Sequence, residues 1–324
     1  MRLKANAAYV TDVGRLREQN QDAAGIAQNQ TSGWPIFVVA DGMGGHAAGE
    51  IAANLTIESV IETLTDAAGD GDPDEQIRRG VELAHQRIQD EIAAHPDKAG
   101  MGTTCLVALL AGRQLHLGHI GDSRAYLFRD GRLEQITSDH SWVNEQIRAG
   151  LLSPAEAARH PMRHVITRAL GPEPVDTELV HRELEPGDWL LLCSDGLTGP
   201  LADDTIAAVL AEADHPEVSA RRLVELANEA GGPDNITVLL VHLETVAEPE
   251  AGSADPEPAP PAAQPARRFK PHLLVLVALV VIALIIAGAI LLLRPANPVQ
   301  TFPPPLPTLP PASQAPWSGE APIL

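Results

Sequence analysis

Four aspartates stand beside small residues at the ends of apolar, strand-like runs, and a fifth follows a polar run. A carboxylate next to a buried strand is costly unless it is compensated, and several carboxylates brought together repel one another. A divalent cation relieves that repulsion, and hard ions such as Mg²⁺ and Mn²⁺ prefer oxygen ligands. A single Asp-Gly pair is typical of a turn, but five acids in one region predict a metal site. They are Asp22, Asp41, Asp122, Asp195 and Asp234.

The stretch "WPIFVVADGMGGHAAGE" shows this setting most clearly. The apolar run from Ile36 to Ala40 ends in Asp41, and glycines follow at positions 42, 44 and 45. Because glycine has no Cβ, a ligand can come close to the backbone there. We therefore expect the carbonyl of Gly42 to act as a further metal ligand.

Composition limits the classes of ligand. The net charge is −20 at pH 7, and nearly all of it lies in residues 1–246. An acidic domain is a poor partner for nucleic acid, whose phosphates need Lys and Arg. Cys105 and Cys193 both lie in apolar runs, so we expect them to be buried hydrophobic residues rather than a disulfide or a CxxC site.

The chain divides into four regions by composition. Residues 1–246 have globular composition, and residues 247–272 form a juxtamembrane linker rich in Pro, Ala and acid. Residues 273–293 are uncharged and long enough for a membrane-spanning helix, and residues 294–324 are a Pro-rich tail. Three basic residues precede the span: Arg267, Arg268 and Lys270. The positive-inside rule then predicts a single-pass protein of the cell membrane, with its large domain cytoplasmic and its tail extracytoplasmic.

Hydrophobic periodicity predicts the fold class of the first region. Apolar residues recur at helical spacing in residues 51–64, 77–92, 204–211 and 217–230. Short strand-like runs fill residues 103–136, which we expect to form an antiparallel meander, and two more follow near residues 190 and 238. Helix pairs alternate with groups of strands, so we predict an α+β domain of antiparallel sheets covered by helices.

Eight motifs then occur in the order seen in one known family. The sequence from about residue 9 to residue 243 resembles bacterial metal-dependent protein Ser/Thr phosphatases of the PP2C (PPM) type. The resemblance implies a central antiparallel β-sandwich flanked by helices, an α-β-β-α arrangement. The motifs are "GRLREQNQD", "VVADGMGGHAAGE", "GTT", "HIGDSRAYLFRDG", "ITSDHS", "HVITRALG", "LLLCSDGL" and "GGPDNITV".

The resemblance also implies a role for each acid. Asp41 would bridge two Mn²⁺ or Mg²⁺ ions, and the carbonyl of Gly42 would hold one of them. Asp195 and Asp234 would complete this pair of sites. Asp122, in "GDSR", would hold a third, weaker ion.

Three further residues are implied to act in catalysis. Arg17, five residues before Asp22, would bind the substrate phosphate, and Asp22 would hold a metal or orient its water. His46 would be the general acid for the leaving oxygen, or would make a structural hydrogen bond near a helix start.

The sequence departs from the family pattern in places. Gln21 stands where many relatives have Glu, and Met43 stands where some eukaryotic relatives have His. His164, in segment 141–168, either reaches the third metal or is only exposed.

The implied reaction is hydrolysis of phosphoserine and phosphothreonine by water that two metal ions activate. No Cys-x5-Arg loop exists for a covalent phosphoenzyme. The expected partners are phosphorylated proteins, including a transmembrane Ser/Thr kinase, and not nucleic acid. Two other functions remain open: a catalytically weak, membrane-tethered phosphoprotein-binding module, and a Ca²⁺-binding structural domain.

Overall fold

The computed structural model describes residues 2–246, except residues 46, 70, 158, 174 and 175. The expected linker, membrane span and tail lie outside the described residues. Within the described part, no helix is long and apolar enough to cross a membrane.

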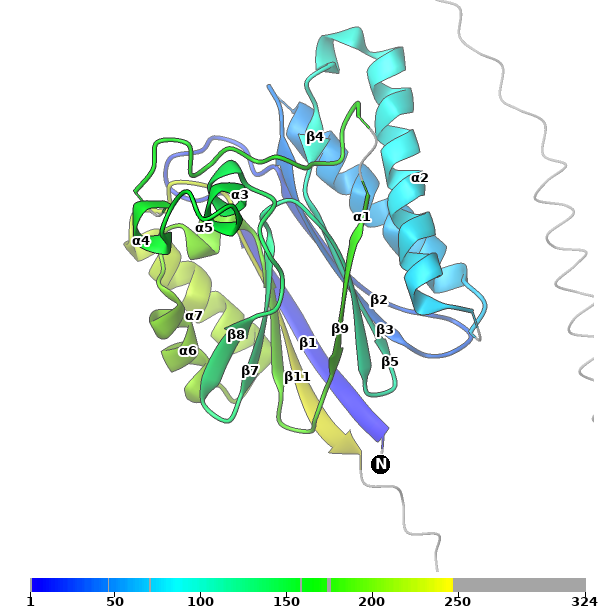
Figure 1. Ribbon diagram of the computed structural model, residues 1–324. Coiled ribbons are helices and arrows are strands. Elements are labelled where there is room, and N and C mark those ends of the chain that lie inside the picture. Colours follow the sequence, from blue (N-terminus) through cyan, green and yellow to red (C-terminus); the bar gives the residue numbers. More distant parts are fainter. Residues whose placement is uncertain (1, 46, 70, 158, 174–175, 247–324) are drawn as a thin grey trace, which may run out of the picture. The chain divides into compact units, whose positions relative to one another are not determined.

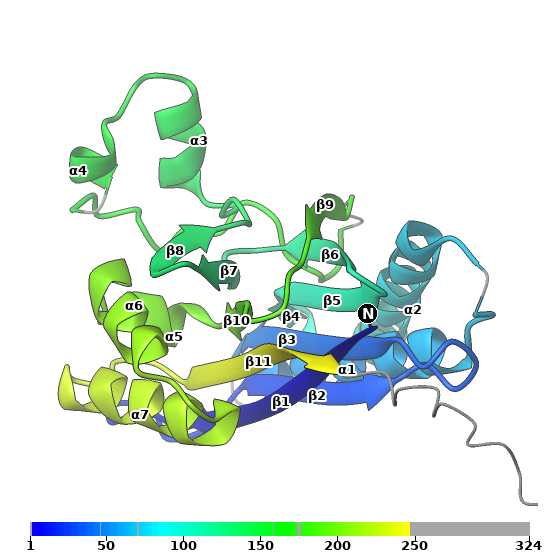
Figure 2. The same ribbon diagram turned by 90° about the horizontal axis from the view of Figure 1, so that it is seen from below.

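Two antiparallel sheets form the centre of the domain (Figures 1 and 2). The first sheet has the strand order β1-β11-β10-β7-β8, and the second has the order β2-β3-β5-β6-β9, with the short β4 paired to β3. The strands of the first sheet are β1 (Arg2–Asp12), β7 (Arg124–Arg129), β8 (Arg132–Gln135), β10 (Trp189–Cys193) and β11 (Ile236–Val246). Those of the second are β2 (Asp22–Gln28), β3 (Pro35–Met43), β4 (Gly102–Thr103), β5 (Cys105–Ala111), β6 (Gln114–Ile120) and β9 (Glu178–Glu183).

Helices cover the outer face of each sheet (Figure 1). The second sheet is covered by α1 (Ala48–Asp66) and α2 (Pro73–Ala94), which the turn η1 (Pro96–Lys98) follows. The first is covered by α5 (Asp195–Thr198), α6 (Asp203–Ala211) and α7 (Pro216–Glu229). Two short helices, α3 (Trp142–Arg148) and α4 (Pro154–Ala157), lie in the segment between β8 and β9.

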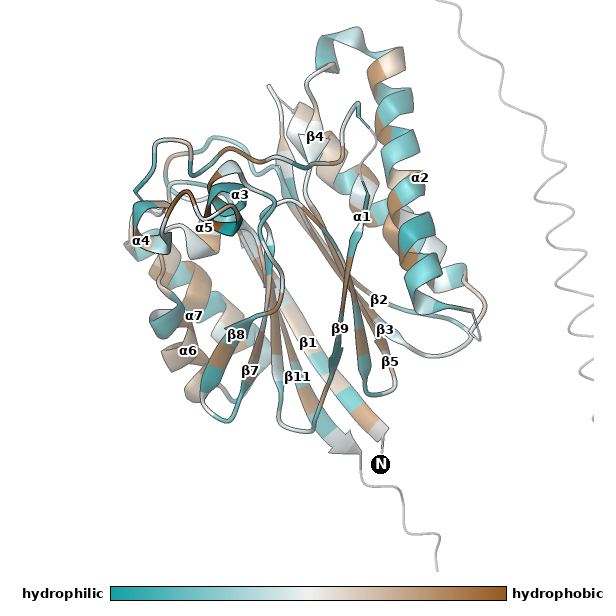
Figure 3. Cartoon of the chain, in the orientation of Figure 1, coloured by the Kyte–Doolittle hydropathy of each residue, from teal (hydrophilic) through white to brown (hydrophobic). Residues whose placement is uncertain are grey.

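Alternation along the strands builds three apolar layers. In β3, Ile36 and Val38 point to the layer under α1 and α2, whereas Phe37 and Val39 point between the sheets. Buried on both faces, such strands read as continuous apolar runs. α2 and α7 each bury one apolar face, and Figure 3 shows hydrophilic and hydrophobic residues alternating along α2. The predicted α-β-β-α arrangement is thus confirmed.

The expected meander in residues 103–136 is wrong in its pairing. β5 and β6 form one hairpin in the second sheet, and β7 and β8 form another in the first sheet. The residues between β6 and β7 therefore cross from one sheet to the other instead of making a hairpin turn. Gly121 permits the crossing with φ of 106°, and Asp122 lies within it.

The layer between the sheets should dominate stability. Leu190 is fully buried there, so Leu190→Ala should destabilise the domain by about 2–5 kcal/mol, because the lost methyl groups leave a cavity. Leu151→Ala is the matched control, since Leu151 is 70% exposed and should change stability by less than about 0.5 kcal/mol. Chemical denaturation measures both, and equal effects would contradict the layer assignment.

Candidate metal centre

The five aspartates come from strand ends at one end of the sandwich. Asp22 on β2 lies directly opposite Asp41 on β3 in the strand register. Asp195 begins α5 just after β10, and Asp234 lies just before β11. Asp122 lies in the crossover between the sheets. Strands distant in sequence thus bring all five acids together.

Electrostatic coupling shows how closely the acids converge. Desolvation raises the pKa of Asp41 well above its usual value, and the charges of Asp22, Asp195, Asp122 and Asp234 raise it further. Each of the other four acids therefore acts on Asp41, the central carboxylate of the cluster.

Asp22 and Asp122 are the most buried of the five. Burial, above the other causes, raises the pKa of each carboxyl to about 7. In the part of the chain that the structure describes, the Oδ1 atoms of both are buried without a hydrogen-bond partner. Buried oxygens without a donor, in an all-oxygen set, fit a hard divalent cation.

Neighbouring groups shift the pKa of Asp195 in opposite directions. Burial, and then the charge of Asp234, raise its pKa, while the neighbouring charges of His164 and Arg17 lower it. His164 and Arg17 therefore both lie near this acid, although they come from distant segments.

The backbone around Asp41 is fixed by the "GTT" motif. The Asp41 amide donates to Oγ1 of Thr104 at 2.9 Å, and the Asp41 carbonyl accepts from the Thr104 amide at 2.9 Å. Oγ1 of Thr103 donates to the same carbonyl at 3.0 Å. No role was predicted for these threonines, and the motif itself was their signal in the sequence.

Gly42 can only be glycine in this packing. A Cβ there would lie 2.1 Å from the carbonyl oxygen of Gly49 and 2.6 Å from that of Gln21. The Gly42 amide donates to the Gln21 carbonyl at 3.1 Å. The start of α1 and the end of β3 therefore approach each other closely beside Asp41.

Ser194 and Asn235 support the acids from the first sheet. Oγ of Ser194 donates to Oδ2 of Asp22 at 2.7 Å and accepts from the Thr237 amide at 3.0 Å. Oδ1 of Asn235 accepts from the Gln21 amide at 2.8 Å, so it holds the segment that leads into β2.

Arg17 lies at the edge of the acid cluster. Its Nη2 donates to Oδ2 of Asp234 at 2.8 Å, and its side chain is 52% exposed. The loop that carries it is anchored by the Arg15 amide, which donates to the Gly232 carbonyl at 2.7 Å. A partly exposed guanidinium thus lies beside the acids, where a solvent-borne anion can reach it.

A cavity of about 810 Å³ opens beside the acids. Asp122 and Asp195 form part of its wall, and His164 lines it from the flap, by which we mean residues 141–177. His164 is exposed, as one of the two expectations had it, and it lies near Asp195; a contact with a third ion stays a prediction. His46 lies outside the described residues.

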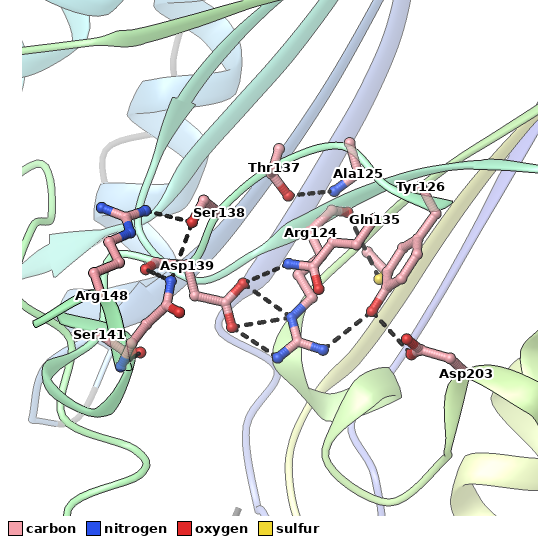
Figure 4. A network of polar contacts seen from close by, with 12 residues as sticks. Arg124, Ala125, Tyr126, Gln135, Thr137, Ser138, Asp139, Ser141, Arg148 and Asp203 are labelled. Carbon is pink, nitrogen blue, oxygen red and sulfur yellow. Dashed lines mark hydrogen bonds and ion pairs between the residues drawn. The ribbon is translucent and has the colours of Figure 1, made fainter. Parts of the chain in front are cut away.

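A partly buried ion pair lies just before the start of the flap (Figure 4). Nε and Nη2 of Arg124 donate to the carboxylate of Asp139, the latter at 2.7 Å, and Nη1 donates to the Tyr126 hydroxyl at 3.0 Å. That hydroxyl donates to Asp203 at 3.2 Å. No role was predicted for Arg124, although it stands in the quoted "GDSR" motif.

His140 ties together both ends of the flap. Its Nδ1 accepts from the Gly121 amide at 3.1 Å, so the proton is on Nε2, which lies 2.9 Å from the carboxylate of Glu178. Burial raises the pKa of Glu178, but the hydrogen bond from His140 and the neighbouring positive charges lower it overall. The flap thus leaves and returns beside the crossover that holds Asp122.

The fold and the acid cluster together define a class of protein. The protein phosphatase 2C family model matches residues 15–232, so the chain belongs to the protein phosphatase 2C family.

Particular relatives agree with that assignment. The chain is 44% identical over 232 residues to the serine/threonine protein phosphatase PstP of Mycobacterium tuberculosis, a match covering 71% of this chain and 43% of the relative. It therefore spans less than half the length of that protein. It is 39% identical to a putative protein phosphatase 2C-type of Streptococcus pyogenes, over 72% of this chain and 96% of that one.

Solved structures show the same similarity. The crystal structure of the Mycobacterium tuberculosis PstP/Ppp phosphatase superposes with a TM-score of 0.70 at 40% identity, covering 76% of this chain and all of that one. The PstP catalytic domain in complex with two manganese ions gives a TM-score of 0.68 at 39% identity, covering 75% of this chain and all of that one.

A variant that lacks one charge of the cluster should keep its stability without metal but gain little stability when Mn²⁺ is added. Asp41→Asn should be at least as stable as the parent without metal, because it removes a carboxyl whose charge the other four disfavour. The parent should gain about 2.7 kcal/mol at a Mn²⁺ concentration a hundredfold above its Kd, and Asp41→Asn should lose most of that gain.

Thermal unfolding with Mn²⁺ and with EDTA measures this difference. Asp90→Asn is the control, because Asp90 is an exposed acid of α2 and should respond to Mn²⁺ as the parent does. An unaltered Mn²⁺ response in Asp41→Asn would contradict a metal site centred on Asp41.

Proposed function

We propose that the folded region hydrolyses phosphoserine and phosphothreonine in proteins, with two Mn²⁺ or Mg²⁺ ions at the acid cluster. The observation that carries the proposal is the convergence of five aspartates at one end of the sandwich, with Asp22 directly opposite Asp41, in a chain of the protein phosphatase 2C family. Two ions held there would act as Lewis acids on the phosphoryl group and make water nucleophilic at neutral pH.

Each residue of the cluster has its own proposed role in binding these ions. Asp41 lies at the centre of the cluster and would bridge the two sites, and the carbonyl of Gly42 would be a further ligand. Asp195 and Asp234 complete the pair. Asp22, held by Ser194, keeps Oδ1 available for a metal or its water. Asp122 has a similarly available Oδ1 beside the cavity, which suits the third, weaker ion.

Arg17 binds the phosphate of the substrate. Arg17 contacts Asp234 through Nη2, and a guanidinium has five N–H donors. The remaining donors can pair with two phosphoryl oxygens, which matches the fork geometry of arginine. His46 is our candidate for protonating the leaving oxygen, with a structural hydrogen bond at the helix start as the alternative role.

Membrane attachment is a second part of the proposal. Residues 273–293 would span the membrane, and the basic residues before them would keep the catalytic domain cytoplasmic. A phosphatase held at the membrane would act on phosphorylated proteins there, including a transmembrane Ser/Thr kinase.

Two alternative functions make different predictions. A phosphoprotein-binding module would bind phosphopeptides without releasing phosphate. A Ca²⁺-binding structural domain would gain stability from Ca²⁺ without hydrolysis. The acid cluster and the accessible Arg17 together favour hydrolysis, because a binding module does not need the cluster and a Ca²⁺-binding domain does not need an arginine beside it.

Arg17→Ala tests the function directly. Charge-assisted hydrogen bonds are worth about 1.5–3 kcal/mol, so kcat/KM on a phosphothreonine peptide with Mn²⁺ should fall roughly 10- to 150-fold. Arg221→Ala is the control, because Arg221 is an exposed residue of α7 that pairs with Glu217. Parent protein that released no phosphate with Mn²⁺, or released it equally with EDTA, would overturn the proposed activity.

Membrane attachment has its own test. The full chain should sediment with membranes and resist extraction by salt and alkali, because a span of about 20 apolar residues inserts stably. A chain that lacks residues 273–293 should remain in the supernatant. A full chain found in the supernatant would contradict the anchor and leave the catalytic proposal intact.

A further inference from the structure

A second group of metal-ligating side chains lies away from the acid cluster. It consists of Asp74 on α2, His116 on β6 and His181 on β9, which we call the His-Asp cluster. Nδ1 of His116 lies 2.7 Å from Oδ1 of Asp74, and Nε2 of His181 lies 2.9 Å from Oδ2. One ligand atom from each residue can be chosen so that all lie within 4.8 Å of one another.

The cluster lies far along the strands from Asp41. His116 is paired with Leu109 on β5, and Leu109 is paired with Ile36 on β3. Ile36 precedes Asp41 by five residues, which corresponds to roughly 16 Å along an extended strand. A ligand of the His-Asp cluster therefore cannot be a ligand of the acid cluster.

The fold positions the three side chains through two tight contacts. His116 and His181 are direct partners in the β6–β9 register, so their side chains share one face of the sheet. Two residues further along that face, Gly118 leaves room for the buried Ile77; a Cβ there would lie 2.4 Å from Cγ2 of Ile77. Asp74 precedes Ile77 by three residues, one helical turn, and so lies over the histidines.

The first turn of α2 is itself fixed. Pro73 occupies the start of the helix, and Oδ1 of Asp72 accepts from the Asp74 amide at 3.1 Å. Partial burial raises the pKa of Asp74, but the hydrogen bonds from His181 and His116 lower it overall, so its carboxylate is ionised near neutral pH.

The distances from each histidine to Asp74 are close to those between ligand atoms of a tetrahedral ion site. Zinc bonds of about 2.0–2.1 Å to nitrogen and carboxylate oxygen require neighbouring ligand atoms roughly 3.3 Å apart. The histidine-to-aspartate contacts are a few tenths of an ångström shorter, so a small opening admits the ion in place of the hydrogen-bonded protons. Two imidazoles and one carboxylate are a ligand set that suits zinc, and exposed His181 gives access from solvent.

We propose that Asp74, His116 and His181 bind one Zn²⁺ ion that is distinct from the ions of the acid cluster. Three protein ligands leave the fourth position to water. The ion joins the first turn of α2 to β9, the edge strand of the second sheet. β9 begins at Glu178, where the flap returns and contacts His140, so zinc fixes the strand that receives the flap.

The test counts tightly bound Zn²⁺ on the full chain by competition with a chromophoric chelator. The acid cluster also takes up zinc, so the quantity of interest is the difference between variants. His116→Ala and His181→Ala should each bind one equivalent fewer than the parent. His215→Ala is the matched control, because His215 is exposed and its side chain makes no capping bond at the start of α7.

Asp74→Asn separates metal binding from hydrogen bonding. An amide can still bond to both histidines but is a poor zinc ligand, so this variant should keep its metal-free melting temperature and lose the extra equivalent. Mn²⁺-dependent phosphate release should persist in all four variants. Equal zinc counts in the parent, His116→Ala and His181→Ala would overturn the proposal and leave the phosphatase assignment untouched.

Discussion

The main constraint on this structure is electrostatic. Five carboxylates lie together at one end of a β-sandwich, where their negative charges repel one another. Desolvation and mutual repulsion both raise the pKa of Asp41, so the protein alone does not stabilise this charge. A divalent cation suits this cluster, since two of its buried carboxylate oxygens find no hydrogen-bond donor among the residues that the structure describes. Folding must therefore hold the acids in place by packing until metal binds.

Packing around the strand ends holds the acids in place. Because side chains alternate along the strands, apolar layers cover both faces of each sheet. These layers hold the strand ends in place. Close contacts then orient the acids. Gly42 packs against Gly49, and Oγ1 of Thr104 accepts a hydrogen bond from the Asp41 amide. Oγ of Ser194 donates to the carboxylate of Asp22. The same sandwich places Arg17 and the flap at the edge of the cluster, where a large substrate can approach.

At the opposite end of the second sheet, helix and strand packing again brings together side chains that can bind a metal, but these include histidines. A helix and two paired strands bring a carboxylate and two imidazoles into contact there. The β6–β9 pair and α2 thus connect the His-Asp cluster with the strand at which the flap returns. A cation at that place acts on stability and on the flap base rather than on phosphate.

Much of this was determined by the sequence itself. Helical periodicity predicted α1, α2, α6 and α7, and the apolar runs predicted antiparallel sheets, because local pattern reports which face of an element is buried. The repeated strand-then-acid setting predicted which aspartates would converge. Their roles as ligands stay predictions, as do that of His46 and the membrane span.

Only the tertiary structure decided which strands pair. The crossover at Asp122 replaced the expected meander, and Arg129 on β7 donates to the buried Asp188 at 2.6 Å, a contact between residues 59 apart in sequence. The Arg124–Asp139 pair and the His-Asp cluster were also missed. Asp74 and His181 are 107 residues apart, and no local periodicity encodes such a contact, because it arises from strand register and helix packing across the whole domain.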